Sequence, residues 1–99
     1  MNSFQGQLEE ELYQRAGEVL HYIWDPIGVA GAPLARDEYD PYLSTVCAML
    51  KSGSSSEDMA NYLQQISLDS MGLHADFSHA LRAASALLEW KKVLDERYT

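Results

Sequence analysis

Few side chains in this sequence are of a type and spacing that could bind a metal ion. His74, Asp76 and His79 stand close together in the chain, and imidazole nitrogens and carboxylate oxygens are the usual ligands of zinc and iron. Three such residues around the start of a helix often occur by chance, and Asp76 is better used as a helix cap. We therefore predict no metal site.

Nucleophilic and acid–base chemistry have equally little support. Cys47 stands among apolar residues, with no sequence context that would lower the pKa of its thiol, so we predict a buried core cysteine. Ser70, Ser78 and Ser85 lack a Gly-x-Ser-x-Gly frame. Carboxylates are numerous, but acid–base catalysis needs two in different environments within a concave pocket, for which a helical domain of 99 residues has little room.

Cofactor binding has only a loose sequence signal. The stretch Gly28-Val29-Ala30-Gly31 distantly resembles a phosphate-binding loop, but no strand precedes it and no Lys-Ser or Lys-Thr pair ends it. We predict no catalytic residue and no cofactor, and therefore a protein that is not an enzyme.

The charge of the chain is more informative than its motifs. Fifteen acidic residues against 7 basic residues give a formal net charge of −8. Nucleic acid would be repelled, because proteins bind it largely by neutralising phosphates with Lys and Arg. The same field attracts basic proteins and speeds encounter with them. A cationic protein partner is therefore favoured, although the charge could also serve solubility alone.

Cellular location follows from cysteine usage and hydropathy. A single thiol cannot form an internal disulfide, which favours a reducing cytosol. The N-terminal residues lack the basic region and apolar run of a signal peptide. No segment approaches the ~18 apolar residues that a helix needs to cross a bilayer. We predict a cytoplasmic protein without membrane association.

Four segments have the apolar spacing of helices, and no segment alternates as a strand does. We predict an all-α fold: one domain over residues 1–99, built as a bundle of about four helices with an irregular loop after the first. The loop, which includes Trp24-Asp25-Pro26-Ile27-Gly28-Val29, is the least regular part, and loops of that length in small domains usually have a function.

The first helix is predicted over roughly residues 4–24. Pro26 ends it, because a residue that precedes proline is displaced from helical dihedrals. His21, near this end, is expected as a surface cap, where an imidazolium favours the negative end of the helix dipole. The expected core residues are Leu8, Leu12, Ala16, Val19, Leu20 and Ile23.

The second helix begins somewhere between Asp37 and Pro41. Asp40 as N-cap would put Pro41 at the first helical position, where its missing N–H costs nothing. Asp37 as N-cap would instead put Asp40 in the first turn, where a second carboxylate can accept from free backbone N–H groups. Lys51 and Gly53 end this helix. Its predicted buried residues are Leu43, Val46, Cys47 and Leu50.

The third helix starts at the serines before Glu57 and Asp58, and ends near Met71. The fourth runs from Asp76 or Ser78 to about Arg97, and its many small residues suit a central helix with neighbours on two sides. The predicted stripe of the third helix is Met59, Tyr62, Leu63 and Ile66. That of the fourth is Phe77, Leu81, Ala84, Leu88 and the stem of Lys91, flanked by Leu87 and Leu94.

One patch has the composition of a protein interface. Tyrosine rings set among carboxylates suit Lys- and Arg-rich surfaces, through charge pairing and cation–π contact. The residues of this patch are Asp37, Glu38, Tyr39, Asp40 and Tyr42. Asp37 could alternatively serve as a helix cap, and Trp24 and Asp25 could mainly hold the loop against the bundle.

Two motifs together carry a resemblance. Trp24-Asp25-Pro26-Ile27-Gly28-Val29 and Asp37-Glu38-Tyr39-Asp40-x-Tyr42, followed by Ile66 and Met71-Gly72-Leu73, resemble a family of small all-helical bacterial domains of unknown function. The resemblance covers roughly residues 8–75. Several members of that family are immunity proteins encoded beside polymorphic toxins, including those of contact-dependent growth inhibition.

The resemblance implies a stoichiometric inhibitor that binds a cognate toxin domain, with no chemistry of its own. Such toxins are often nucleases with basic clefts, which an acidic protein can occupy as a phosphate mimic. The implied toxin-binding residues are those of the acidic patch, joined by Glu9, Glu10 and Glu11. The alternative is a homo-oligomeric scaffold or a regulatory interaction protein without a toxin partner.

Overall fold

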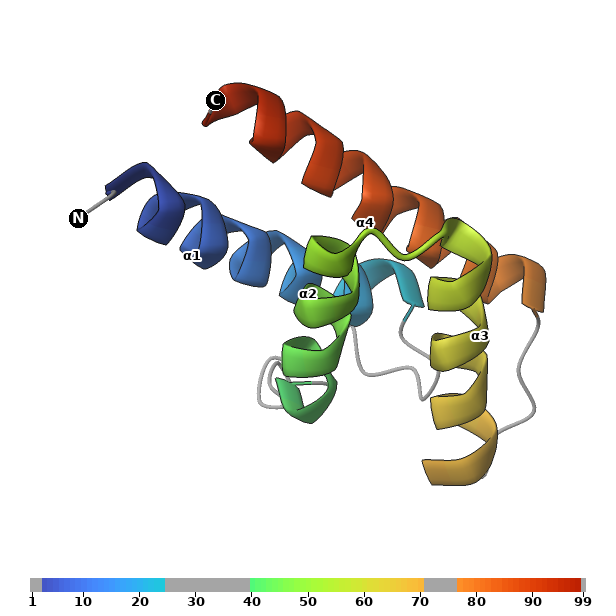
Figure 1. The fold of residues 1–99 in the computed structure, drawn as a ribbon. Coiled ribbons are helices and arrows are strands. Elements are labelled where there is room, and N and C mark those ends of the chain that lie inside the picture. The colour runs from blue at the N-terminus through green and yellow to red at the C-terminus, as the bar shows by residue number, and fades with distance from the viewer. Residues whose placement is uncertain (1–2, 25–39, 71–76, 99) are drawn as a thin grey trace.

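The computed structural model describes residues 3–24, 40–70 and 77–98, and the fold is all-α (Figure 1). The long helices are α1 (Ser3–Val19), α2 (Leu43–Ser52), α3 (Ser56–Gln65) and α4 (Phe77–Arg97). Within the described residues, short helical turns extend them: the π-helical turns η1 (Leu20–Trp24) and η4 (Ile66–Ser70), which continue α1 and α3, and the 3-10 turn η3 (Asp40–Tyr42), which leads into α2. The predicted helix limits agree with these bounds to within a few residues.

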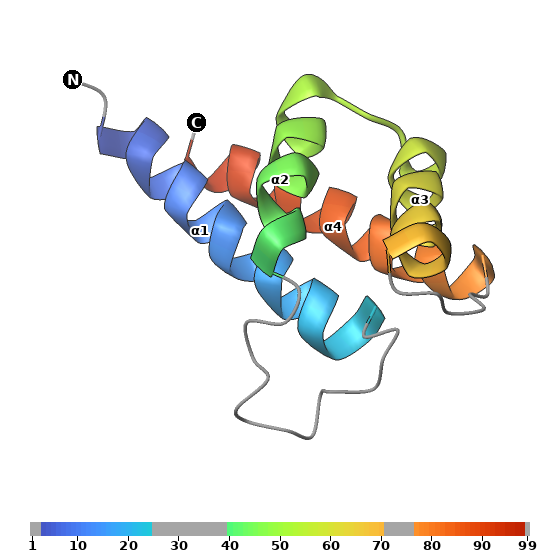
Figure 2. The ribbon, with the colours of Figure 1, turned by 90° about the horizontal axis from the view of Figure 1, so that it is seen from below.

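The helix α4 is central to the fold, because α1, α2 and α3 all contact it. Figures 1 and 2 show α1 and α4 side by side and antiparallel, so that the first and last helical turns lie at the same end of the molecule. The α3 helix lies against the first half of α4, and α2 stands beside α1. The prediction of a central fourth helix with neighbours on two sides is confirmed.

The register of the first helix changes at the π-helical turn η1. Leu12, Ala16, Val19 and Leu20 are buried as predicted, but Ile23 is 37% exposed and Trp24 is 1% exposed. A π-helical turn bonds i to i+5 and is wider than an α-helical turn, so it delays the return to the core by one residue. The prediction that Ile23 belongs to the core is therefore wrong, and Trp24 takes that place.

The end of α2 and the start of α3 use signals found in the sequence, whereas the N-cap of α2 is Tyr42, which makes no side-chain capping hydrogen bond. Helical structure begins at Asp40 with Pro41 in the first turn. Gly53, at φ +84°, ends α2, and its N–H donates to the Leu50 carbonyl. Positive φ is accessible to glycine without strain. Ser55 caps α3, its Oγ accepting from the Asp58 N–H at 3.1 Å.

The buried side of α4 is rotated from the predicted stripe. Phe77, at the start of the helix, is 40% exposed, and Leu81 and Leu88 are only partly buried. The buried residues are Ala80, Ala83, Ala84, Leu87 and Leu94. Small residues turn inward because α3 and α1 approach α4 closely on two sides, so Leu87 and Leu94 supply the larger apolar contacts. Of the predicted stripe, Ala84 is buried and Leu81 and Leu88 pack partly buried against the core, while Phe77 is wrongly placed. The two flanking leucines, Leu87 and Leu94, are core residues.

No helix among the described residues has the length and apolar character required to cross a membrane.

Candidate partner-binding face

The predicted acidic patch lies only partly within the described residues. Asp37, Glu38 and Tyr39 fall outside them, and of Asp40 only the backbone, at the start of η3, is described. Tyr42 is partly buried and packs against the core, its ring edge-to-face with that of Trp24 at a centroid distance of 6.4 Å. Tyr42 therefore supports the core edge and presents only part of its surface to a partner.

The three consecutive glutamates of α1 have different surroundings. Lys51 Nζ, at the end of α2, donates to Glu9 Oε1 at 3.1 Å. Glu11 lies toward the C-terminal end of α4 and accepts from Tyr98 Oη at 2.8 Å and from Arg97 Nη1 at 2.9 Å. Glu10 is exposed and forms no ion pair within the described part of the chain. Of the three, Glu10 is the carboxylate best placed to meet a partner.

The Glu11 network holds the two terminal helices together. The Tyr98 hydroxyl, and then Arg97 and Arg15, hold the pKa of Glu11 below its usual value, while partial burial opposes them. Arg15 also pairs with Glu18 at 2.6 Å and lies over the Trp90 ring at 5.4 Å. Glu11 is therefore a structural residue, and its membership of the toxin-binding surface implied by resemblance has no support from this geometry.

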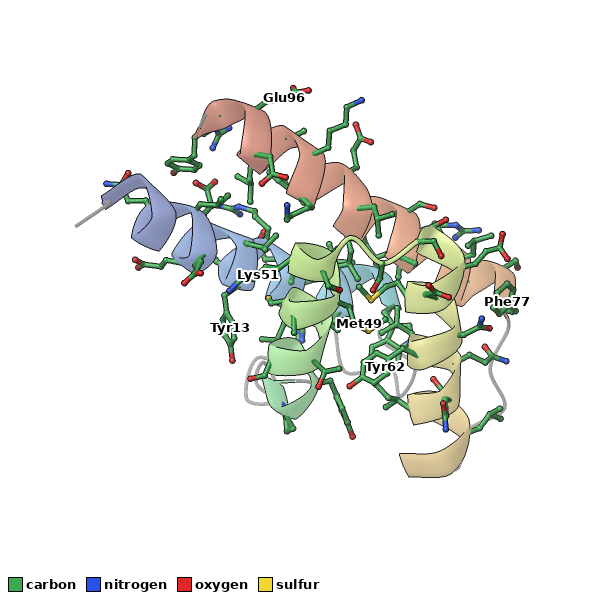
Figure 3. All side chains as sticks on the ribbon, viewed as in Figure 1. Tyr13, Met49, Lys51, Tyr62, Phe77 and Glu96 are labelled. Atoms are coloured by element: carbon green, nitrogen blue, oxygen red, sulfur yellow. The ribbon has the colours of Figure 1, made fainter. Side chains whose placement is uncertain are left out.

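An exposed face of α1 continues from Glu10 toward α2. Helical neighbours recur at steps of three and four residues, so Glu10 shares this side with residues one, two and three turns later. We call it the α1 face, and define it as Glu10, Tyr13, Gln14, Glu18 and Tyr22. Tyr13 is 45% and Tyr22 60% exposed, and Figure 3 shows Tyr13 projecting away from α4. The spacing of these tyrosines with Glu10 and Glu18 is visible in the sequence, but their exposure on one face is shown only by the structure.

A groove of about 230 Å³ lies within the α1 face. Tyr13, Gln14 and Glu18 line it from α1, Tyr22 lines it from η1, and Leu43 lines it from the first turn of α2. Gly17 and His21 complete the lining. A Cβ at Gly17 would lie 3.5 Å from Leu43 Cδ1, so the glycine leaves the groove open while α2 stays in contact with α1.

His21 is buried in this groove, and the prediction that it caps the helix at the surface is wrong. The residue is 5% exposed, because the wide turn η1 rotates it toward the core with Leu20 and Trp24. Its ring meets that of Tyr22 edge-to-face at 4.5 Å. Its Nδ1 is shielded from water and has no hydrogen-bond partner among the described residues. Buried polar atoms are normally paired, so this nitrogen is an exception that calls for an explanation.

His79 has a structural role that the sequence analysis did not assign. His74 and Asp76 lie outside the described residues, and within them no three His, Cys, Asp or Glu side chains are grouped as metal ligands. His79 Nε2 is 2.8 Å from the Trp24 carbonyl oxygen. A carbonyl only accepts, so Nε2 carries the proton and donates it to the last turn of η1.

Cys47 is buried, as predicted. Desolvation raises the pKa of its thiol, and the positive charge of Lys51 offsets this only in part. A thiol held in its neutral form is a poor nucleophile.

No family model, curated protein or solved structure matches this chain.

Proposed function

We propose that this protein is an immunity protein that binds a cognate bacterial toxin domain, a nuclease with a basic cleft, and neutralises it in the cytoplasm. The motif resemblance supplies the class of partner. The charge of −8 supplies the sign of the partner's surface. The observation that carries the proposal is the α1 face, where exposed tyrosines stand beside Glu10 and Glu18.

Internal pairing of the basic side chains strengthens this argument. Arg15, Lys51, Lys91 and Arg97 each form an ion pair with a carboxylate of the same chain. Most positive charge in the described part of the chain is thus already neutralised, and the excess of carboxylates gives the surface its field. A basic cleft meeting this surface gains long-range attraction on approach and cation–π contact at the tyrosines.

Tyrosines on this face are suited to binding rather than to catalysis. Tyr side chains provide large contact areas at low cost in conformational entropy, and they are enriched at interfaces. The acidic residues Asp37 and Glu38, with Tyr39, would extend the same surface; their part in binding stays a prediction from sequence.

The proposal is tested with the product of the open reading frame immediately upstream. Co-expression should rescue cells from that product, and the two purified proteins should form a stoichiometric complex. Glu10→Lys should raise the Kd at least about tenfold at about 0.15 M salt, where the Debye length of about 8 Å keeps the effect local. The circular dichroism of the variant should stay helical.

Glu96→Lys is the matched control. It makes the same change of charge at an exposed residue near the C-terminal end of α4, away from Tyr13 (Figure 3). Its Kd should stay within about threefold of wild type. If both variants weakened binding equally, the cause would be the overall charge of the protein and not a local contact at Glu10. The proposal would be contradicted if co-expression gave no rescue and the two proteins formed no complex. A stable homo-oligomer in light scattering would then favour the scaffold.

A further inference from the structure

We propose that the groove in the α1 face is the binding site for a single arginine side chain of the cationic partner. The inference deepens the proposed function and rests on it for the identity of the partner. It rests on the groove itself for the identity of the side chain. The volume of about 230 Å³ is below the 300–1,000 Å³ typical of small-molecule pockets, and it suits one side chain rather than a larger ligand.

Every polar side chain that lines the groove can accept a hydrogen bond, and Glu18 is an acceptor only. Arg15 Nη1 donates to Glu18 Oε1 at 2.6 Å, and Glu18 Oε2 makes no hydrogen bond with a described residue. Gln14 adds an amide oxygen. No Lys or Arg side chain lines the groove. A deprotonated anion has no hydrogen to donate to these acceptors, whereas a guanidinium supplies five donors and no acceptor.

The buried imidazole of His21 needs a hydrogen-bond donor for its Nδ1 atom. The Nδ1 of His21 has no partner among the described residues although the side chain is almost fully buried. In the tautomer that carries its proton on Nε2, Nδ1 is an acceptor, and an arginine N–H would satisfy it. The Tyr22 ring contacts the imidazole edge-to-face and is 60% exposed, and in the proposed complex it turns aside to let the guanidinium reach Nδ1.

Two tyrosines favour arginine over lysine. Tyr13 and Tyr22 both line the groove, and a planar guanidinium stacks on aromatic rings while its edge donates to carboxylate and amide oxygens. The lysine ammonium is a compact, strongly hydrated charge that cannot stack in this way. The groove therefore selects arginine by shape as well as by charge.

The test uses a short probe before any toxin is involved. The peptide acetyl-Gly-Arg-Gly-amide is titrated into the full-length protein, and the ring signals of Tyr13 and Tyr22 and the imidazole ¹⁵N signals of His21 are followed by NMR. Saturable shifts are expected with the arginine peptide, including a hydrogen-bond shift at Nδ1. The citrulline peptide, which keeps the shape but not the charge, should shift these signals at least about tenfold more weakly, and the lysine peptide should also bind more weakly.

The variant Gly17→Met is designed to fill the groove with its own side chain. The space next to Leu43 accepts a Cβ, and methionine is a better helix former than glycine, so the variant should fold with an unchanged or higher melting temperature. Its side chain should fill the groove and abolish the arginine-dependent shifts. Gly6→Met, also in α1 with no atom within 4 Å of the added Cβ, is the matched control and should bind the peptide like wild type.

The outcomes separate this inference from the proposed function. Absent shifts, or shifts that persist in Gly17→Met or are equal for the citrulline peptide, would overturn the arginine site. If the upstream product binds wild type and Gly17→Met equally but fails to bind Glu10→Lys, the groove is not an anchor and the proposed function stands. If the arginine peptide binds in the groove but the upstream product is ignored, the arginine site stands without the toxin partner.

Discussion

At the scale of single residues, environment rather than identity decided what each candidate does. His21 and His79 have the same side chain, and both lie near the C-terminal end of the first helix. His79 is paired with the Trp24 carbonyl oxygen, while His21 Nδ1 is buried without a described partner. Sequence reasoning could not separate them, because a contact with a residue 55 positions away leaves no trace in local spacing.

The buried thiol of Cys47 should react slowly with alkylating reagents. Burial raises the pKa of its thiol and removes it from solvent, so in native protein at pH 8 it should react with a maleimide or with iodoacetamide at least about a hundredfold more slowly than a free cysteine. Labelling followed by mass spectrometry measures this rate. The same thiol should react readily in denaturant. Fast labelling of the native protein would show that the thiol is accessible and overturn the assignment of Cys47 to the core.

At the scale of elements, periodicity located the helices and the buried residues of α2, but it misplaced residues at the end of the first helix and at the start of α4. In η1 a π-helical turn shifts the register, so that Trp24 replaces Ile23 in the core. In α4 the buried side passes through alanines, because two neighbouring helices contact it closely. A stripe drawn at one α-helical period does not follow the wider turn η1, and in α4 it runs beside the buried alanines.

Substitutions in α4 test this rotated face. Leu87 is fully buried, so Leu87→Ala should reduce the free energy of unfolding by about 2–5 kcal/mol through lost burial and a residual cavity. Phe77, the first residue of the predicted stripe, is 40% exposed, and Phe77→Ala should cost no more than about 1 kcal/mol. Urea denaturation with unchanged m-values measures both. A larger loss for Phe77→Ala would restore the stripe predicted from sequence.

At the scale of the whole molecule, the two terminal helices are joined by contacts between residues from opposite ends of the chain. Glu11 of α1 meets Arg97 and Tyr98 at the end of the chain. Because the pKa of Glu11 is lowered in the folded state, its contribution to stability is complete above the unfolded value of 4.5 and is lost as the pH falls through the lower folded value. The pKa of Tyr98 is raised, chiefly by its hydrogen bond to Glu11, so its contribution is lost only in alkali, as the pH rises through a value above 10.0.

The substitution Glu11→Gln should therefore make the stability of the protein less dependent on pH in the acid range. The variant should have a lower melting temperature than wild type at pH 7, and the difference should narrow between about pH 5 and pH 3 as Glu11 of the wild type becomes protonated. Calorimetry at a series of pH values measures this. Glu10→Gln removes a carboxylate without a described ion pair and is the control. Parallel curves for wild type and Glu11→Gln would show that the network does not contribute to stability.

The sequence by itself determined the helical class, the approximate limits of the helices, their caps at Ser55 and Gly53, and the sign of the surface charge. These depend on local backbone preferences and on composition, which need no knowledge of distant residues. Tertiary structure decided which carboxylates stay unpaired, which histidine is buried, and that Gly17 leaves a groove between α1 and α2. Those properties arise from contacts between residues far apart in the chain, and no periodicity along one helix encodes them.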